Sequence, residues 1–328
     1  ATKRTTYRTV VAWANGNVRA LKKDIATALK KLQGRERELG LVATIISAFA
    51  LDWRYGTNQY MNFLVMGPAG SGKTTLATYM GHMLQHAGLV FRKGPMIEST
   101  RTDFIGQYLG QSGPKTNAQL EAARERVLFI DEAYALAKCS KRGPGFSCEQ
   151  WDQYSTESMT ALVAFLSQNI GQIIVIAAGY QSDMYDTFMA INEGIPRRFP
   201  NVVVLRPMTD DKLLEIFYAI LKSKDVGSPD TKQDFDRYVS QQANDVLLDV
   251  LKHDQPHKVD TGGSLKTMSR SVFKYEASDM VNLANKIVTY MLTRNKGKGV
   301  EKLSKCAMVS ILNKIVFDRI QKYIVTSQ

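Results

Sequence analysis

Residues 67–74 read Gly-Pro-Ala-Gly-Ser-Gly-Lys-Thr, and they directly follow the apolar run Phe63-Leu64-Val65-Met66. A glycine-rich loop of this spacing is informative only between a buried strand and the start of a helix. Both flanks are present, because residues 74–85 contain no proline, a single glycine and apolar residues at helical spacing. The sequence therefore predicts a strand, a phosphate-binding loop and a helix in succession.

The residue types of this loop suit the phosphates of a nucleotide. Glycines allow backbone N–H groups to curl around phosphate oxygens, and the positive end of the following helix favours the same anion. Lys73 would reach the β- and γ-phosphates, and the hydroxyl of Thr74 would hold Mg²⁺. We therefore expect a nucleoside triphosphate to bind at Gly67, Pro68, Ala69, Gly70, Ser71, Gly72, Lys73, Thr74 and Thr75.

A second motif lies farther along the chain, where residues 127–132 read Val-Leu-Phe-Ile-Asp-Glu. Four apolar residues predict a buried strand, and the carboxyl ends of such strands meet ligands in α/β proteins. Asp131 can orient Mg²⁺ through its water shell, because this ion keeps several waters and takes few direct carboxylates. Glu132 is placed to polarise the water that attacks the γ-phosphate. Acids commonly end strands, so this motif gains its weight from the glycine-rich loop.

Short apolar runs alternate with helical patterns between residues 61 and 207, which predicts an α/β fold with a mainly parallel, five-stranded sheet. Strands are expected at 62–66, 95–99, 127–131, 173–178 and 202–205, and helices at 74–85, 115–124, 155–167 and 184–191. After Pro207 the strand pattern stops. Helical periodicity at 210–222, 235–251, 277–294 and 303–324 predicts an all-helical second domain, with exposed loops at 224–232 and 253–271.

These patterns divide the chain into a basic segment, 1–60, with expected helices at 18–33 and 41–51, the α/β domain, 61–207, and the helical domain, 208–328. The net charge of +12 is concentrated at the ends, since residues 1–40 carry ten Lys and Arg against three acids, and residues 286–328 nine against two. Such ends favour an acidic partner, either nucleic acid or an anionic protein surface, or else a solvated helix face. No Arg-aromatic nucleic-acid motif accompanies them.

Composition also bears on the compartment. No apolar run approaches the roughly 20 residues that cross a bilayer, so we expect no membrane span. Three cysteines, at positions 139, 148 and 306, show no metal-type spacing and are interpreted as reduced thiols. The chain is therefore predicted to be cytoplasmic or to reside in another reducing intracellular compartment.

A third string, Asn192-Glu193-Gly194-Ile195-Pro196-Arg197-Arg198-Phe199-Pro200, completes a set that resembles the AAA+ ATPases. Within this superfamily the chain resembles the group of CbbX (Rubisco activase) and SpoVK (a sporulation protein). The supporting strings are residues 103–116, Phe129-Ile130-Asp131-Glu132-Ala133-Tyr134-Ala135-Leu136 and Ala178-Gly179-Tyr180. The resemblance covers residues 61–207 well and is diffuse in the lid.

The resemblance implies an ATP hydrolase with a P-loop AAA+ core and a helical lid, using ATP and Mg²⁺ and assembling into a ring, usually a hexamer. Arg198, with Arg197 as its companion, would be the arginine finger that reaches the γ-phosphate of the neighbouring subunit. Tyr108-Leu109-Gly110 matches the loop that such rings project into their central channel to grip a protein client. The basic segment 138–151 is a candidate for a second channel-facing loop.

Two positions depart from the pattern of many AAA+ proteins. Tyr180 stands where a polar residue often senses the γ-phosphate, and no arginine stands near residues 277–279, where the lid often contacts nucleotide. Three functions therefore stay open. The first is a ring that remodels or threads a protein client, the second is a nucleic-acid-stimulated motor or loader, and the third is a low-turnover, ATP-gated assembly scaffold.

Overall fold

The computed structural model describes residues 19–32, 34–52, 59–90, 92, 94–140, 150–223, 247, 257–260, 265–268, 280, 282–287, 307–308 and 311. The chain divides into two compact units. The first comprises residues 1–68 and 72–206, and the second comprises residues 69–71 and 207–328. Each unit is described by itself below.

The first unit is built on a five-stranded sheet in which every strand pair is parallel. The strand order is β2-β3-β6-β1-β7. The bounds are β1 Phe63–Met66, β2 Ile97–Ser99, β3 Val127–Ile130, β6 Ile174–Gly179 and β7 Asn201–Val204. The predicted α/β fold and its five strands are confirmed.

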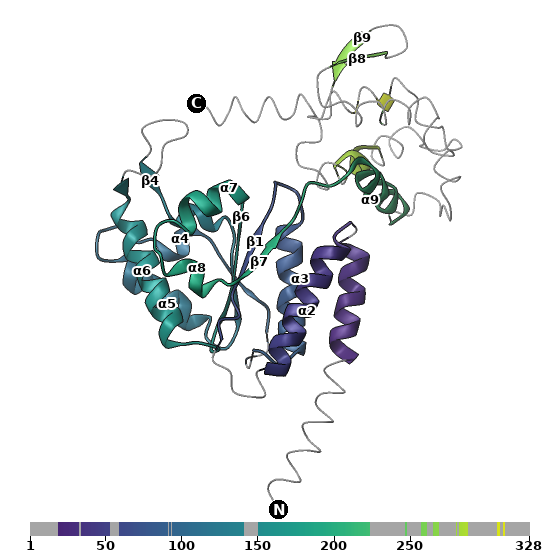
Figure 1. Cartoon of the computed structure of the whole chain (residues 1–328). Helices are drawn as coiled ribbons and strands as arrows, with labels where there is room; N and C mark the ends of the chain where they lie inside the picture. Colours follow the sequence, from purple (N-terminus) through teal and green to yellow (C-terminus); the bar gives the residue numbers. More distant parts are fainter. Residues whose placement is uncertain are drawn as a thin grey trace, which may run out of the picture. The chain divides into compact units, whose positions relative to one another are not determined.

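Helices cover both faces of this sheet, which is why its central strands are apolar throughout. Residues 19–31 form a helix that lies with α2 (Glu36–Asp52) and α3 (Lys73–His86) on one face (Figure 1). The other face carries the remaining short and long helices (Figure 1). They are α4 (Arg101–Phe104), α5 (Ser112–Ala122), η2 (Ala133–Leu136), α6 (Gln153–Gln168), α7 (Gln181–Asp183), η3 (Met184–Phe188) and α8 (Ile195–Arg198).

Side chains that alternate along the strands supply two separate cores. Phe63, Val65 and Phe129 are buried against α2 and α3, whereas Leu64 and Leu128 are buried with the helices of the opposite face. This alternation is the period-two pattern of a strand with both faces covered. The apolar run before the glycine-rich loop is therefore the centre of the domain and holds that loop on a rigid base.

The register of the sheet brings the ends of three strands to one edge. Met66 of β1 pairs with Gly179 of β6, and Ile130 of β3 pairs with Ala177 of β6. The N–H of Gly67 extends the ladder by donating to the carbonyl of Gly179 at 3.2 Å. The segments that follow these strands therefore emerge side by side at the carboxyl edge of the sheet.

The second unit contains one structure that the sequence did not predict. Helix α9 (Asp210–Ser223) begins where expected, and residues 282–287 are helical within the predicted helix 277–294. The expected exposed loop 253–271 instead contains an antiparallel hairpin of β8 (His257–Asp260) and β9 (Leu265–Met268). The expectation of an exposed loop is therefore wrong at these two strands, because short strands of mixed polarity on either side of Thr-Gly-Gly-Ser resemble a loop in sequence. Most of the expected helices 235–251 and 303–324 lies outside the described residues.

Two expectations about composition can also be compared with the structure. Cys139 is disulfide-bonded, so the interpretation of all three cysteines as reduced thiols is wrong for this residue. The other two, at 148 and 306, lie outside the described residues. In the part of the chain that is described, no helix has both the length and the apolar character to cross a membrane.

A buried asparagine ties the central strands together and supplies a test of this packing. The side chain of Asn62 donates to the carbonyl of Arg198 at 2.8 Å and accepts from the N–H of Val175 at 2.8 Å. Replacing Asn62 by Ala leaves two backbone groups, the carbonyl of Arg198 and the N–H of Val175, without this hydrogen-bond partner. We therefore expect a loss of about 2–4 kcal/mol in the free energy of unfolding. Urea unfolding measures it, and Asn117→Ala, at an exposed position of α5, is the matched control. Equal effects of the two substitutions would contradict this role.

Candidate nucleotide site

The glycine-rich loop has the backbone conformation that its sequence requires. Gly70 and Gly72 have φ angles of 74° and 93°, in the left-handed region that side chains rarely occupy. Gly72 is also the residue before α3, which begins at Lys73 and runs for 14 residues. The loop thus passes directly into a helix whose N-terminus favours an anion.

Lys73 is held at the start of α3 by the loop itself. Its ammonium group donates to the carbonyls of Gly67 at 3.0 Å and Pro68 at 2.9 Å. The same nitrogen lies 4.9 Å from the ring centroid of Tyr180, which follows β6. These are neutral partners, so a phosphate, which makes stronger charge-assisted bonds, can replace them.

Two oxygen atoms from different segments approach each other beside the loop. The hydroxyl of Thr74 lies 3.4 Å from a carboxylate oxygen of Asp131, although β6 separates their strands. The other carboxylate oxygen of Asp131 accepts from the N–H of Glu132 at 3.0 Å. Hydroxyl and carboxylate oxygens are ligands that Mg²⁺ takes together with waters and phosphate oxygens, so this pair fits the predicted ion.

Glu132 has an unusual backbone and a defined side-chain partner. Its φ angle is 48°, in the left-handed region, and the residue is exposed at the sheet edge. The side chain of Glu132 forms a hydrogen bond with Tyr134. Burial, and after it the negative charge of Glu132, raises the pKa of Tyr134 well above its usual range, so the phenol keeps its proton and donates to the carboxylate.

Tyr134 also contacts the residue in the sensor position. Its ring centroid lies 5.6 Å from that of Tyr180, whose ring in turn faces the ammonium group of Lys73. A side chain on Gly179 would meet Tyr134 and Met184 at 2.8 Å, so only glycine allows this approach. The two tyrosines therefore form a continuous contact between Lys73 and Glu132.

The two adjacent arginines have different surroundings. The guanidinium of Arg198 donates to the hydroxyl of Ser167, at 2.6 Å from Nη2 and 3.2 Å from Nε, and to the carbonyl of Gly194 at 3.2 Å. It also lies 5.8 Å from the ring of Tyr60. Arg197 is exposed, and no hydrogen bond or ion pair joins its side chain to the described part of the chain. Neither guanidinium is bonded to the glycine-rich loop of its own subunit.

The predicted channel loop presents its apolar side chains to solvent. Tyr108 is 69% exposed and Leu109 is 59% exposed. The backbone beneath them is held by Glu157 of α6, which accepts from the N–H of Gly110 at 3.2 Å and from that of Gly113 at 2.9 Å. Gly106 opens the loop, and a side chain there would come within 2.5 Å of Gln111. The backbone of the turn is therefore held by hydrogen bonds, while the side chains of Tyr108 and Leu109 are exposed and do not pack on their own domain.

The segment 138–151 is described only at its two ends. Residues 139–140 form β4 and residues 150–151 form β5, and the two pair antiparallel. Residues 141–149 lie outside the described range. A channel-facing role for this segment stays a prediction.

Comparison with known proteins gives the family. Residues 63–199 match the model of the "ATPase family associated with various cellular activities (AAA)". The chain is 30% identical over 234 residues to the protein CfxQ homolog of Galdieria sulphuraria, which covers 71% of this chain and 69% of that protein. The chain belongs to the AAA family of ATPases. The predicted resemblance to the CbbX-like AAA+ group is thereby confirmed.

Other relatives extend the comparison of this AAA ATPase. The protein CfxQ homolog of Guillardia theta is also 30% identical, over 71% of this chain and 72% of its own length. The ESX-1 secretion system protein EccA1 of Mycolicibacterium smegmatis is 33% identical over 175 residues. That match covers 53% of this chain but 29% of EccA1, so it concerns one part of a longer protein.

As an AAA ATPase the chain binds nucleotide and hydrolyses ATP. Of the residues predicted from the motifs, Lys73, Thr74, Asp131 and Glu132 come together at one sheet edge, whereas Arg197, Arg198 and residues 108–110 lie on other elements. Tyr134 was missed as a partner of Glu132. Its position two residues after the predicted catalytic acid was the available signal.

The role of Glu132 can be tested by an isosteric change. Glu132→Gln keeps the size of the side chain but cannot polarise the attacking water, so we expect turnover to fall about 10²- to 10⁴-fold. ATP affinity should be retained, because the phosphate contacts come from the loop and Lys73. Phosphate release and fluorescent-nucleotide titration measure the two quantities. The control is Glu121→Gln, at an exposed position of α5. Full turnover by the Glu132 variant would remove it from the mechanism.

Proposed function

We propose that this AAA ATPase forms a ring, in which ATP is bound between neighbouring subunits and its hydrolysis remodels or threads a protein client through the central channel. The observation that carries the proposal is the exposed pair Tyr108 and Leu109, on a turn fixed to the same domain as the nucleotide site. Mg²⁺ is the proposed metal, at Thr74 and Asp131.

The exposure of this pair favours contact with another chain. Two adjacent large apolar side chains at 69% and 59% exposure leave most of their surface in water, where it gains nothing for folding. An extended polypeptide could bury that surface without a specific sequence, because aromatic and aliphatic contacts are not directional. A protein client is therefore better matched to the loop than a phosphate backbone, which binds to basic side chains.

The arginines support a site that is shared between subunits. The bonds of Arg198 to Ser167 and Gly194 fix the turn that presents Arg197 to solvent. A guanidinium arriving from a neighbour would neutralise charge on the γ-phosphate in the transition state. The prediction that Arg198 is this finger stays a prediction. The contacts favour Arg197 as the one that extends and Arg198 as the one that holds the turn.

The name of one relative also favours a protein client. EccA1 is by its name a protein of a secretion system, and the chain matches 29% of it. A homo-oligomeric ring of six subunits and a protein client are the partners that we propose for this chain.

The channel loop can be tested without knowledge of the natural client. Tyr108→Ala should leave basal ATP turnover within about twofold of wild type, since the loop follows α4 whereas Lys73 begins α3 and Glu132 follows β3. It should abolish the processing of a generic unfolded probe, fluorescently labelled casein, because the aromatic grip is lost. Tyr185→Ala, a change at another exposed tyrosine (45%), is the matched control. If wild type engages casein and the Tyr108 variant does so equally well, threading by this loop is ruled out.

A further inference from the structure

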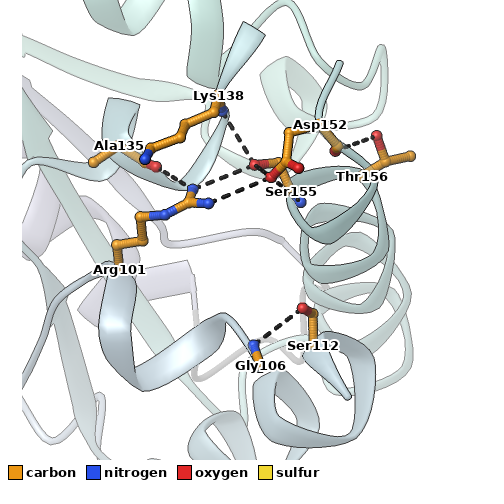
Figure 2. A network of polar contacts seen from close by, with 8 residues as sticks. All are labelled: Arg101, Gly106, Ser112, Ala135, Lys138, Asp152, Ser155 and Thr156. Atoms are coloured by element: carbon orange, nitrogen blue, oxygen red, sulfur yellow. Dashed lines mark hydrogen bonds and ion pairs between the residues drawn. The ribbon is translucent and has the colours of Figure 1, made fainter. Parts of the chain in front are cut away.

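One guanidinium connects three segments near the nucleotide site. Nη1 of Arg101 donates to the carbonyl of Ala135, at 2.5 Å, and to the hydroxyl of Ser155, at 3.3 Å. Nη2 of the same side chain donates to the carboxylate of Asp152 at 3.3 Å. Figure 2 shows these bonds converging from α4, η2 and the start of α6. The planar fork of arginine suits such multiple recognition, and lysine cannot reproduce it.

The partners of Arg101 also close the base of the β4–β5 hairpin. The hydroxyl of Ser155 accepts from the N–H of Lys138 at 3.1 Å, and the N–H of Asp152 donates to the carbonyl of Lys138 at 3.1 Å. Lys138 immediately precedes β4, and Asp152 immediately follows β5. The position of the hairpin is thereby bound to the position of Arg101 (Figure 2).

Each of the three segments leads to a functional element. Ala135 lies three residues after Glu132, in η2. Arg101 is the first residue of α4, which runs directly into the loop that carries Tyr108 and Leu109. Five residues after Asp152, Glu157 of α6 holds that same loop through Gly110 and Gly113. A displacement of η2 would therefore be passed by the side chain of Arg101 to the hairpin and to the channel loop that carries Tyr108 and Leu109, which is called the aromatic loop below.

Arg101 is not needed to form the helix on which it acts. The carboxylate of Asp152 already accepts from the N–H of Ser155 at 3.2 Å, which is the cap of α6. The ion pair is also partly open to water, with side-chain exposures of 22% for Arg101 and 31% for Asp152. Such pairs contribute modestly to folding. The arrangement is thus more extensive than the stability of α6 requires.

We propose that Arg101 is a positioning residue that transmits the nucleotide state from the segment after Glu132 to the β4–β5 hairpin and to the aromatic loop. The inference rests on the proposed function, since it assigns the residue that moves the proposed channel loops together. Nucleotide binding shifts Glu132 and η2, the carbonyl of Ala135 moves Arg101, and Asp152 carries the movement to the hairpin.

A tryptophan in the hairpin allows a direct test. The sequence contains three tryptophans, at positions 13, 53 and 151, and Trp151 lies in β5. A parent protein with Trp13→Phe and Trp53→Phe therefore reports on the hairpin alone. Saturation with Mg²⁺ and the non-hydrolysable analogue AMP-PNP should change its emission. Arg101→Lys should remove most of this change, because a single ammonium group cannot bond to the carbonyl of Ala135 and the carboxylate of Asp152 as the planar guanidinium does.

The controls separate transmission from folding and from nucleotide binding. In Arg101→Lys, fluorescent-nucleotide affinity and the urea midpoint should stay close to those of the parent. Arg124→Lys alters an ion pair of the same type, with Glu121 at 2.8 Å on α5, and should respond as the parent does. Asp152→Asn, which keeps an oxygen that can cap α6, removes the charge that Arg101 meets and should weaken the response in the same way. The two changes combined should add little, because both break one path.

The responses of the three single variants decide between the outcomes. A response lost in Arg101→Lys and Asp152→Asn but kept in Arg124→Lys supports the inference. A parent that binds AMP-PNP without any change at Trp151, or variants that respond as the parent does, overturns it. Neither of these outcomes touches the proposed function, which fails separately if wild type neither assembles nor engages casein.

Discussion

The parallel pairing of β3, β6 and β1 is the constraint on which the site depends. Because Met66 pairs with Gly179 of β6 and Ile130 pairs with Ala177, the loop after β1 and the acids after β3 emerge at one edge. A slip of one residue in either pair would turn the side chains to the opposite face and separate Thr74 from Asp131. The two apolar cores fix that register, so packing remote from the glycine-rich loop determines the spacing of the predicted catalytic groups.

The polar groups at this edge are held by hydrogen bonds, and two aromatic rings pack behind them. Lys73, Asp131 and Glu132 each form a hydrogen bond with a neighbouring group of the protein. Behind them, Tyr134 and Tyr180 pack against each other and depend on the missing side chain of Gly179. In this position two aromatic rings stand where many AAA+ proteins place a single polar sensor. Lys73 and Glu132 are thus connected through ring contacts and one phenolic hydrogen bond.

The parts of the fold and the site that have a local signal could be predicted from the sequence. The glycine-rich loop, the acids at 131–132 and the five strands each follow from short patterns, and the structure shows them together. Contacts between residues far apart in the sequence could not be predicted. The partners of Arg101 lie 34, 51 and 54 residues away, and no spacing rule links them. The hairpin 257–268 was missed because two four-residue strands of mixed polarity resemble a loop, and the differing environments of Arg197 and Arg198 depend on Ser167 of another helix.

The central claim is that neighbouring subunits each supply half of one catalytic site, and mixed rings test it most directly. Subunits with Lys73→Ala keep both arginines but cannot bind ATP productively, and subunits with Arg197→Ala and Arg198→Ala bind ATP but lack the guanidinium groups. Each variant alone should hydrolyse ATP at background rate. Mixing them should restore turnover, because seams between unlike subunits regain an intact loop opposite intact arginines. If mixtures that co-assemble stay as inactive as the separate variants, the site is not shared.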